Sequence, residues 1–224
     1  FYTGMGLKYI SNWGQKVIAV SDDIREYLME NYKVRYEDIF VTINGIDTEK
    51  FSPETDGTKA RKEFGLKAEE PTLVYVSRMD ESRALVARQL QAIPGLRMLI
   101  VGGGDVFEEL LEESRKTNAQ IGRECITMTG GRTDINELVA VADVFVGVSR
   151  AALEAMAAEK PVIVAGNEGY IGLFGEDKLE LAQENNFCCR GCELSNENLL
   201  YRDVVHAFND LTEEQRQKMG AYGR

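Results

Sequence analysis

Short apolar segments alternate with helical segments along most of this chain, and that alternation constrains its fold more than any other feature. β-Branched and other apolar residues dominate residues 72–77, 96–102, 125–129, 144–148 and 161–165. Stretches with helical spacing separate these segments, and two more follow near 196–209 and 212–222. Apolar strands joined by helices are typical of a parallel sheet covered on both faces. The sequence from Thr58 onward therefore predicts a Rossmann-like, doubly wound α/β domain.

A partial strand–helix–strand pattern precedes this domain. Residues 16–20 and 39–43 have strand composition, and residues 24–32 have helical spacing. Turn-forming residues without periodicity follow in 44–57. We expect residues 1–47 to be the end of a second α/β unit, 48–57 a linker and 58–224 the complete domain. Because the chain begins at Phe1 in a stretch that looks internal, we also expect it to be a fragment or a trimmed chain.

One connection within the larger domain is unusually short. The segment between Arg83 and Leu96 includes Pro94 and must return the chain from one parallel strand to the next. Parallel neighbours normally require a crossover of a dozen or more residues. The helix that we expect from about Glu81 therefore has little room, and we expect residues to be deleted or missing from this segment.

Charge and composition exclude several classes of function. Lys and Arg number 26 against 37 Asp and Glu, which gives a net charge of −11. Duplex nucleic acid is therefore not expected as a partner, because phosphate contacts need a basic surface. With His206 as its one histidine, the chain has little material for histidine-based catalysis. No apolar run approaches the ~18 residues of a membrane span, and we expect a cytoplasmic protein.

Four cysteines raise the question of a metal site. Cys188, Cys189 and Cys192 crowd into "NNFCCRGC", and Cys125 stands apart. The last two of the cluster have the spacing of zinc ligands, but no second Cys pair completes a four-ligand site. We therefore predict free thiols and no metal.

The loops after the predicted strands contain the candidate binding residues. In doubly wound sheets, ligands bind beyond the carboxyl ends of the strands. These loops read "SRMDESR", "GGGDVF", "GGRTDI", "SRAALE" and "GNEGYIG". Their glycines allow a ligand to approach the backbone closely, although glycines after a strand are often only turns. The candidates among them are Gly102, Gly103, Gly130 and Gly131.

Three charged side chains sharpen this prediction. Arg78 and Arg83 follow a strand in an acidic protein, and arginine binds phosphate oxygens in a bidentate manner. Solvated surface arginines are the alternative. Glu154 lies in the first turns of a helix that begins near Ser149, where a carboxylate can accept hydrogen bonds from ribose hydroxyls. Its alternative is a helix-dipole or capping role.

Together these segments resemble a known enzyme family. "VIAVSDDIREYL" and "VTINGIDTEKFSP" are similar to the end of the N-terminal domain and the linker of retaining glycosyltransferases of family 4 type, which have the GT-B fold of two facing Rossmann-like domains. "VYVSRMDESR" resembles the family's Gly-Arg-then-Lys signature, with Ser77 for Gly and Arg83 for Lys. "LRMLIVGGGD" resembles its glycine-rich loop, and "LEAMAAEKPVIVAG" its C-terminal signature. The chain therefore resembles mainly the C-terminal, donor-binding half of the fold.

The resemblance implies a reaction and a set of roles. It implies transfer of a sugar from a nucleoside diphosphate sugar to an acceptor hydroxyl, with retention, without metal and without cofactor. Arg78 and Arg83 would act as the catalytic cations on the diphosphate. The donor would be held by the loop of Gly102 and Gly103, and its base by the backbone of Gly130, Gly131 and Arg132. Its phosphates would be bound by the amides of Ser149, Arg150, Ala151 and Ala152. Its ribose would be bound by Glu154.

The resemblance also sets expectations about partners. We expect a UDP-sugar in preference to a GDP-sugar as donor, and a glycan or a lipid-linked sugar in polysaccharide biosynthesis as acceptor. Peripheral membrane association would run through a missing N-terminal domain. Because that domain holds most of the acceptor site in the family, we expect this chain alone to bind donor with modest affinity and to transfer sugar poorly.

One departure and three alternatives remain. Many family members carry a Glu-Gly-Phe-Gly loop whose glutamate precedes the helix glutamate by eight residues, but that count leads here to Val146 inside a strand. The loop has contracted, as in the undecaprenyl-linked N-acetylglucosaminyltransferase of peptidoglycan synthesis, and Arg150 is a candidate replacement. The alternatives are a sugar-nucleotide epimerase, a dinucleotide oxidoreductase, for which "VGGGDVFEE" lacks the third glycine, and a non-catalytic nucleotide-sugar-binding domain.

Overall fold

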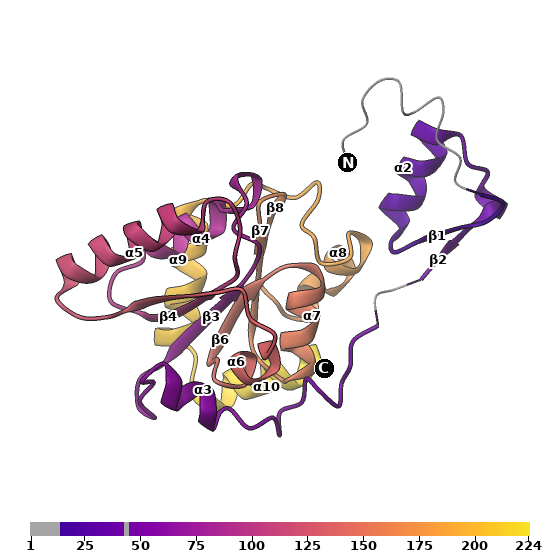
Figure 1. The fold of residues 1–224 in the computed structure, drawn as a ribbon. Helices are drawn as coiled ribbons and strands as arrows, with labels where there is room; N and C mark the ends of the chain where they lie inside the picture. Colours follow the sequence, from indigo (N-terminus) through magenta and orange to yellow (C-terminus); the bar gives the residue numbers. More distant parts are fainter. Residues whose placement is uncertain (1–13, 43–44) are drawn as a thin grey trace.

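A six-stranded sheet forms the centre of the computed structural model, which describes residues 14–42 and 45–224 (Figure 1). The strand order is β5-β4-β3-β6-β7-β8. The first five of these are mutually parallel, and β8 runs antiparallel to β7. The strands are β3 (Thr72–Val76), β4 (Arg97–Val101), β5 (Ile126–Gly130), β6 (Val144–Gly147), β7 (Val162–Gly166) and β8 (Gly169–Leu173). The predicted doubly wound α/β fold is confirmed, with one strand more than the sequence indicated.

Helices cover both faces of this sheet. Alternate residues of each strand point to opposite faces, so Leu73 and Tyr75 pack in one core and Val74 packs in the other. Helices α4, α5 and α9 cover the first face, while α3, α6, α7 and α8 cover the second, where α10 packs against α7. Their bounds are α3 (Thr58–Glu63), α4 (Leu85–Gln91), α5 (Phe107–Ile121), α6 (Ile135–Ala140), α7 (Ser149–Ala157), α8 (Leu179–Glu184), α9 (Glu197–Val205) and α10 (Glu213–Gly223).

The hairpin of β7 and β8 corrects the sequence analysis, which took "GNEGYIG" as a loop and expected a purely parallel sheet. Every residue of β8 is buried. Gly172 has a φ of +88°, and a Cβ there would lie 2.4 Å from Oδ2 of Asp203. The hydroxyl of Tyr170 donates to that same carboxylate oxygen at 2.7 Å. The glycines and the asparagine suggested turns, but contacts with α9, about 30 residues further along, hold this segment in the sheet.

The short connection between β3 and β4 contains the helix expected from about Glu81, although that helix begins later, at Leu85. Helix α4 has only seven residues, yet its Val86, Ala87 and Leu90 are fully buried against the sheet. Pro94 falls after the helix, in the turn that leads into β4, where a missing N–H costs little. The helix expected from about Glu81 is therefore present but short, as the limited room indicated, and the expectation that residues are missing from this segment stays a prediction.

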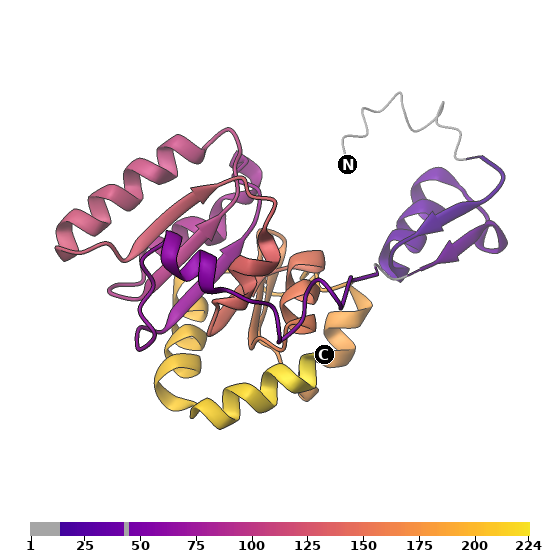
Figure 2. The same ribbon diagram turned by 60° about the horizontal axis from the view of Figure 1, so that its bottom comes forward.

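A small second unit lies at the N-terminal end of the described chain (Figure 2). Strands β1 (Val17–Ala19) and β2 (Ile39–Val41) pair in parallel, and α2 (Asp22–Tyr32) connects them. The unit has its own small core, to which Leu28 contributes from α2. The following segment belongs structurally to the larger domain, since Phe51 is buried in that domain's core. The proposed boundaries at 47 and 57 stay predictions, and residues 1–13 lie outside the described part.

Within residues 14–42 and 45–224, no helix combines the length and the apolar composition needed to cross a bilayer.

Candidate functional site

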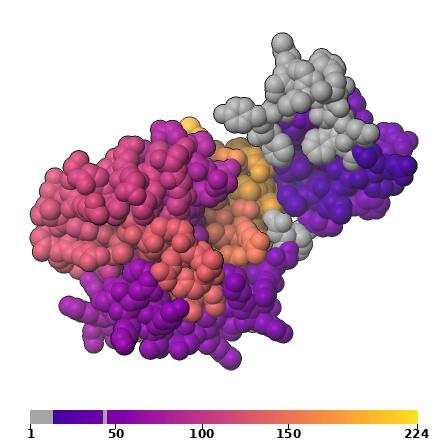
Figure 3. Space-filling model, viewed as in Figure 1, coloured from indigo at the N-terminus to yellow at the C-terminus, as the bar shows by residue number. Residues whose placement is uncertain are grey.

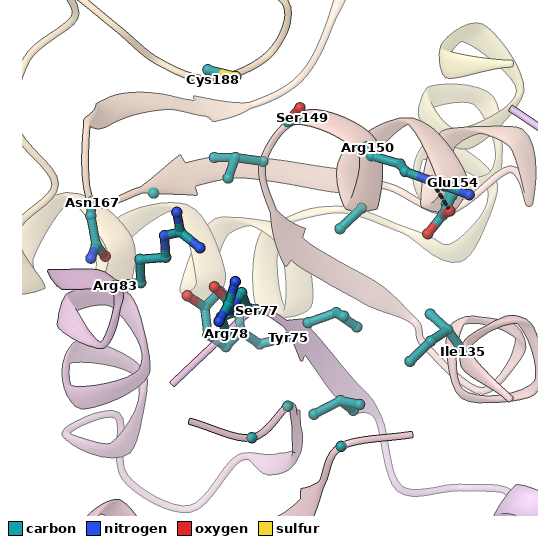
Figure 4. A pocket seen from close by; sticks show the side chains of 18 of the residues that line it. Tyr75, Ser77, Arg78, Arg83, Ile135, Ser149, Arg150, Glu154, Asn167 and Cys188 are labelled. Carbon is teal, nitrogen blue, oxygen red and sulfur yellow. Dashed lines mark hydrogen bonds and ion pairs between the residues drawn. The ribbon is translucent and has the colours of Figure 1, made fainter. Parts of the chain in front are cut away.

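A cavity of about 910 Å³ opens at the carboxyl ends of the parallel strands (Figure 4). Segments that follow β3, β4, β5, β6 and β7 all contribute to its wall. It spans the position between β3 and β6 where the strand order reverses, which is where doubly wound sheets bind ligands. Of the twelve residues selected from the sequence, all but Gly130 and Ala152 line this cavity.

The two arginines that follow β3 share one carboxylate. Nε of Arg78 lies 3.2 Å from Oδ2 of Asp80, and Nη1 of Arg83 lies 3.7 Å from the same oxygen. The side chains of Arg78 and Arg83 remain 72% and 53% exposed, respectively. Their guanidinium groups are therefore available to an anion in the cavity, and Asp80 holds them close together until one arrives.

The glycine-rich loop after β4 packs against the backbone of the loop that carries these arginines. Gly102 has a φ of +144°, and a Cβ there would lie 1.7 Å from the carbonyl oxygen of Ser77. At Gly104 a Cβ would lie 2.4 Å from the backbone of Met79. Backbone hydrogen bonds join the two loops, including one of 3.0 Å from Met79 N to Gly103 O. Two of the three glycines thus serve loop packing, and Gly103 lines the cavity.

The turn between β6 and α7 offers a reduced set of amides. Ser149 has a φ of +50°, an uncommon conformation for a residue with a side chain. Its N–H donates to the carbonyl oxygen of Phe187 at 2.7 Å, and Ala152 donates to Val148 within the helix. Among the described residues this leaves the amides of Arg150 and Ala151 without a partner. Of the four amides that the resemblance assigns to phosphate, the described residues therefore leave two free at the positive end of the helix dipole.

Glu154 projects from α7 into the wall of the cavity. The residue is only 9% exposed, and its Oε1 accepts a hydrogen bond of 2.8 Å from Nε of Arg150 (Figure 4). Arg150 is 73% exposed at its side chain, so it is free to rotate away. The pairing keeps a nearly buried carboxylate compensated while leaving its second oxygen toward the cavity, on the side where Figure 4 shows Ile135.

Arg132 lines the cavity, but its side chain is already engaged. Its guanidinium pairs with Glu63 at 2.7 Å and with Asp134 at 2.7 Å, and it lies over the ring of Phe64. The hydrogen bonds that Arg132 donates to the carboxylates of Asp134 and Glu63 raise the pKa of Arg132 above its usual value. Only the backbone of this segment remains for a ligand, and its role at the base stays a prediction. Gly130 lies behind it, where its carbonyl accepts from Gly102 at 2.9 Å.

The cysteine cluster reaches the cavity through one member. All four cysteines are free, and Cys188 is part of the wall. Burial raises the pKa of Cys188, and it raises the pKa of Cys189 to about 12, so neither is a ready thiolate. Residues 14–42 and 45–224 contain no group of three or more His, Cys, Asp or Glu side chains placed to hold a metal.

We expect purified protein to contain no stoichiometric zinc. Thiolate ligands must be deprotonated to bind zinc, and the raised pKa values of Cys188, Cys189 and Cys192 oppose this. Elemental analysis of the purified chain measures the metal directly. About one zinc per chain would overturn the prediction.

Several wall residues were not singled out from the sequence. Asn167 and Glu168 form the turn of the β7–β8 hairpin, and Nδ2 of Asn167 donates to the carbonyl oxygen of Ser82 on the arginine loop. The loop containing them was recognised as a candidate region, but these contacts join residues 85 positions apart. Tyr75 also reaches the cavity, and burial raises its pKa to about 12, so at neutral pH it is a neutral hydroxyl and not a base.

The fold and the site define a class of protein in which a Rossmann-like domain carries a cavity lined by arginines and glycine-rich loops at the carboxyl ends of its strands. A family model described as Glycosyl transferases group 1 matches residues 70–186, which is more than half of the chain. The chain belongs to this family. The matched segment includes both arginines, the glycine-rich loop and Glu154.

Curated relatives and solved structures agree with this assignment. The chain is 31% identical over 102 residues to the D-inositol 3-phosphate glycosyltransferase of Mycobacteroides abscessus, a match that covers 45% of this chain and 23% of the relative. It is 27% identical over 181 residues to the putative glycosyltransferase EpsD of Bacillus subtilis, which covers 64% and 47%, respectively. The chain thus spans at most about half the length of these relatives.

The fold is shared with solved glycosyltransferases. A glycosyltransferase from Rickettsia africae superposes with a TM-score of 0.72 at 21% identity, over 100% of this chain and 62% of that one. Anabaena HepE, solved in complex with UDP and glucose, superposes with a TM-score of 0.73 at 20% identity, over 99% and 62%. These similarities confirm the expected GT-B architecture, of which the larger domain here is one half.

Proposed function

We propose that the cavity binds a nucleoside diphosphate sugar and that the protein transfers the glycosyl group to an acceptor hydroxyl. One observation carries this proposal. Two exposed arginines, two free helix-terminal amides and a nearly buried carboxylate, drawn from separate segments, line one cavity at the switch point of the sheet. Cations and amides suit a diphosphate, and a carboxylate suits ribose hydroxyls. Membership of the Glycosyl transferases group 1 family supports the same reading.

The proposed reaction breaks the bond between the anomeric carbon and the diphosphate oxygen, and forms a bond from that carbon to the acceptor oxygen. The diphosphate leaves with the electron pair, and an oxygen of that leaving group takes the proton of the acceptor hydroxyl. Arg78 and Arg83 stabilise the negative charge that develops on the leaving group, and the free amides of α7 assist them. No step of this proposal uses a metal ion or a cofactor, and the anomeric configuration is retained, as the resemblance implies.

We propose a UDP-sugar as donor and a glycan or a lipid-linked sugar as acceptor. HepE was solved with UDP, and one curated relative, 26% identical over 171 residues and matched over 43% of its own length, is an Escherichia coli galactosyltransferase named for UDP-Gal and a diphosphoundecaprenol acceptor. A thermal-shift panel of UDP, GDP, ADP and their sugars tests the donor. Stabilisation by UDP compounds above the others is expected, and no shift with any nucleotide would remove the proposal.

We predict that Glu154→Gln weakens UDP binding about five- to tenfold, because it removes the charge from hydrogen bonds to ribose. The loss should be smaller for the 2′-deoxy nucleotide, which offers one hydroxyl fewer. Calorimetric titration of both nucleotides into both proteins measures the difference. Equal losses for the two nucleotides would leave Glu154 with a structural role beside Arg150.

A non-catalytic nucleotide-sugar-binding domain and an epimerase-like enzyme are the alternatives to transfer. An epimerase would release free UDP from the donor without acceptor, whereas a transferase would require acceptor for turnover. The assay therefore measures UDP release from UDP-sugars with and without a lipid-linked or oligosaccharide acceptor. Nucleotide binding without turnover under either condition, also in a chain extended at its N-terminus, would favour the binding domain.

A further inference from the structure

In the proposed donor complex, one end of the cavity has not been assigned to any part of the nucleotide sugar. Along the carboxyl edge of the sheet, the base segment after β5 and the hairpin of β7 and β8 are separated by β4, β3 and β6. With neighbouring strands about 4.8 Å apart, these ends lie roughly 19 Å from each other. The base is assigned to the β5 end and the diphosphate to the arginines and α7 near the middle. The remaining part of a nucleotide sugar, the sugar, must then lie toward the hairpin.

The hairpin end presents hydrogen-bond acceptors. The amide N–H₂ of Asn167 donates to the carbonyl oxygen of Ser82. Its Oδ1 is a hydrogen-bond acceptor and has no partner among the described residues. Oε2 of Glu168 accepts a hydrogen bond from Nε of Arg190 at 2.7 Å. Oε1 of Glu168 has no hydrogen-bond or ion-pair partner among the described residues. Figure 4 shows Asn167 beside Arg83, on the opposite side of the cavity from Glu154. The diphosphate site and the hairpin turn are therefore neighbours.

Arg190 holds Glu168 in place from outside the cavity. The guanidinium of Arg190 also pairs with Asp23 at the start of α2, in the N-terminal unit. Figure 3 shows that unit, in indigo, directly against the orange part of the larger domain. Because Arg190 lies between two carboxylates, its own positive charge is balanced and is not offered to a ligand at this end of the cavity.

We propose that Asn167 and Glu168, with Arg190 as the positioning residue of Glu168, form the subsite for the transferred sugar and select an uncharged hexosyl group. This inference rests on the proposed function. An ionised carboxylate only accepts hydrogen bonds, so it suits sugar hydroxyl or amide N–H donors and disfavours a second carboxylate. Uronic acid donors are thereby disfavoured relative to uncharged hexosyl donors. The subsite also supplies a contact to the sugar that the contracted loop before α7 lacks.

Calorimetry with UDP, UDP-glucose, UDP-N-acetylglucosamine and UDP-glucuronate tests the inference. For Glu168→Gln we expect about fivefold or greater loss of affinity for at least one of the two uncharged sugars, with UDP changed less than twofold. The loss identifies which sugar is recognised. Arg190→Ala should reproduce this selective loss, which a general destabilisation would not do. Glu180→Gln, an exposed change on α8, should leave all four affinities unchanged.

The acidic donor gives an independent readout. The unsubstituted chain should bind UDP-glucuronate more weakly than the preferred uncharged donor. In Glu168→Gln the difference between these two affinities should be smaller. Equal losses for UDP and UDP-sugars, no loss at all, or UDP-glucuronate bound as tightly as the preferred sugar would each overturn the inference while leaving the proposed function intact. Failure of UDP itself to bind the unsubstituted chain would instead remove the proposed function, and the inference with it.

Discussion

Replacing Gly102 by alanine should destabilise the larger domain by at least about 3 kcal/mol. The added Cβ would lie 1.7 Å from the carbonyl oxygen of Ser77, and that oxygen belongs to backbone that cannot rotate away. The φ of +144° adds conformational strain for any residue with a side chain. Urea denaturation followed by circular dichroism measures the change as a lower midpoint of unfolding.

Gly131→Ala is the matched control for this experiment. Gly131 also follows a strand and lines the same cavity, but no atom lies within 4 Å of the position its Cβ would take. Its φ is not in the left-handed range, so we expect a change within about 0.5 kcal/mol. A Gly102→Ala midpoint as high as that of Gly131→Ala would show that the two loops separate easily, contrary to the packing described here.

The double change of Arg78 and Arg83 to alanine should weaken UDP binding by about 3 kcal/mol, or roughly 150-fold. Each arginine is assigned about 1.5 kcal/mol, the lower end for a hydrogen bond to a charged group, because both side chains are more than half exposed. Uridine, which has no phosphate, should bind the variant and the unsubstituted chain equally. Calorimetry with both ligands separates the contribution of the phosphates.

Arg115→Ala provides the control for loss of positive charge. Arg115 lies on α5 with a side chain 67% exposed, and it does not line the cavity. Its removal should leave UDP affinity unchanged at moderate salt, where distant charges are screened. A parallel loss of uridine and UDP affinity in the double variant would instead mean that the two arginines support the shape of the cavity and do not bind phosphate.

Much of the fold could be predicted because its signals are local. The apolar runs of β3 to β7 and the helical spacing between them depend only on neighbouring residues, and the structure places strands and helices there. Strand β8 could not be recognised in this way. Its glycines indicated a turn, whereas the contact between Tyr170 and Asp203 that anchors it joins residues 33 positions apart.

The candidate site shows the same division. Arg78, Arg83 and Glu154 were found because the rule for doubly wound sheets selects the loops after strands, and all three line one cavity. Their roles in binding stay predictions. The hydrogen bond from the Ser149 amide to the carbonyl oxygen of Phe187 was not predictable. It depends on how a distant segment folds back over α7. Sequence patterns thus located the cavity wall but not the contacts that already occupy some of its groups.

The interlocking of the loops after β3 and β4 has a consequence for engineering. Met79 donates to Gly103, and Val106 donates to Met79, each at 3.0 Å, so neither loop keeps its shape without the other. If the arginine loop were replaced by that of a relative with a different donor preference, the new loop would therefore not fit against the glycine-rich loop after β4. Residues 77–83 and 102–106 form the smallest exchangeable module, and chimaeras that respect this unit should fold where single-loop chimaeras fail.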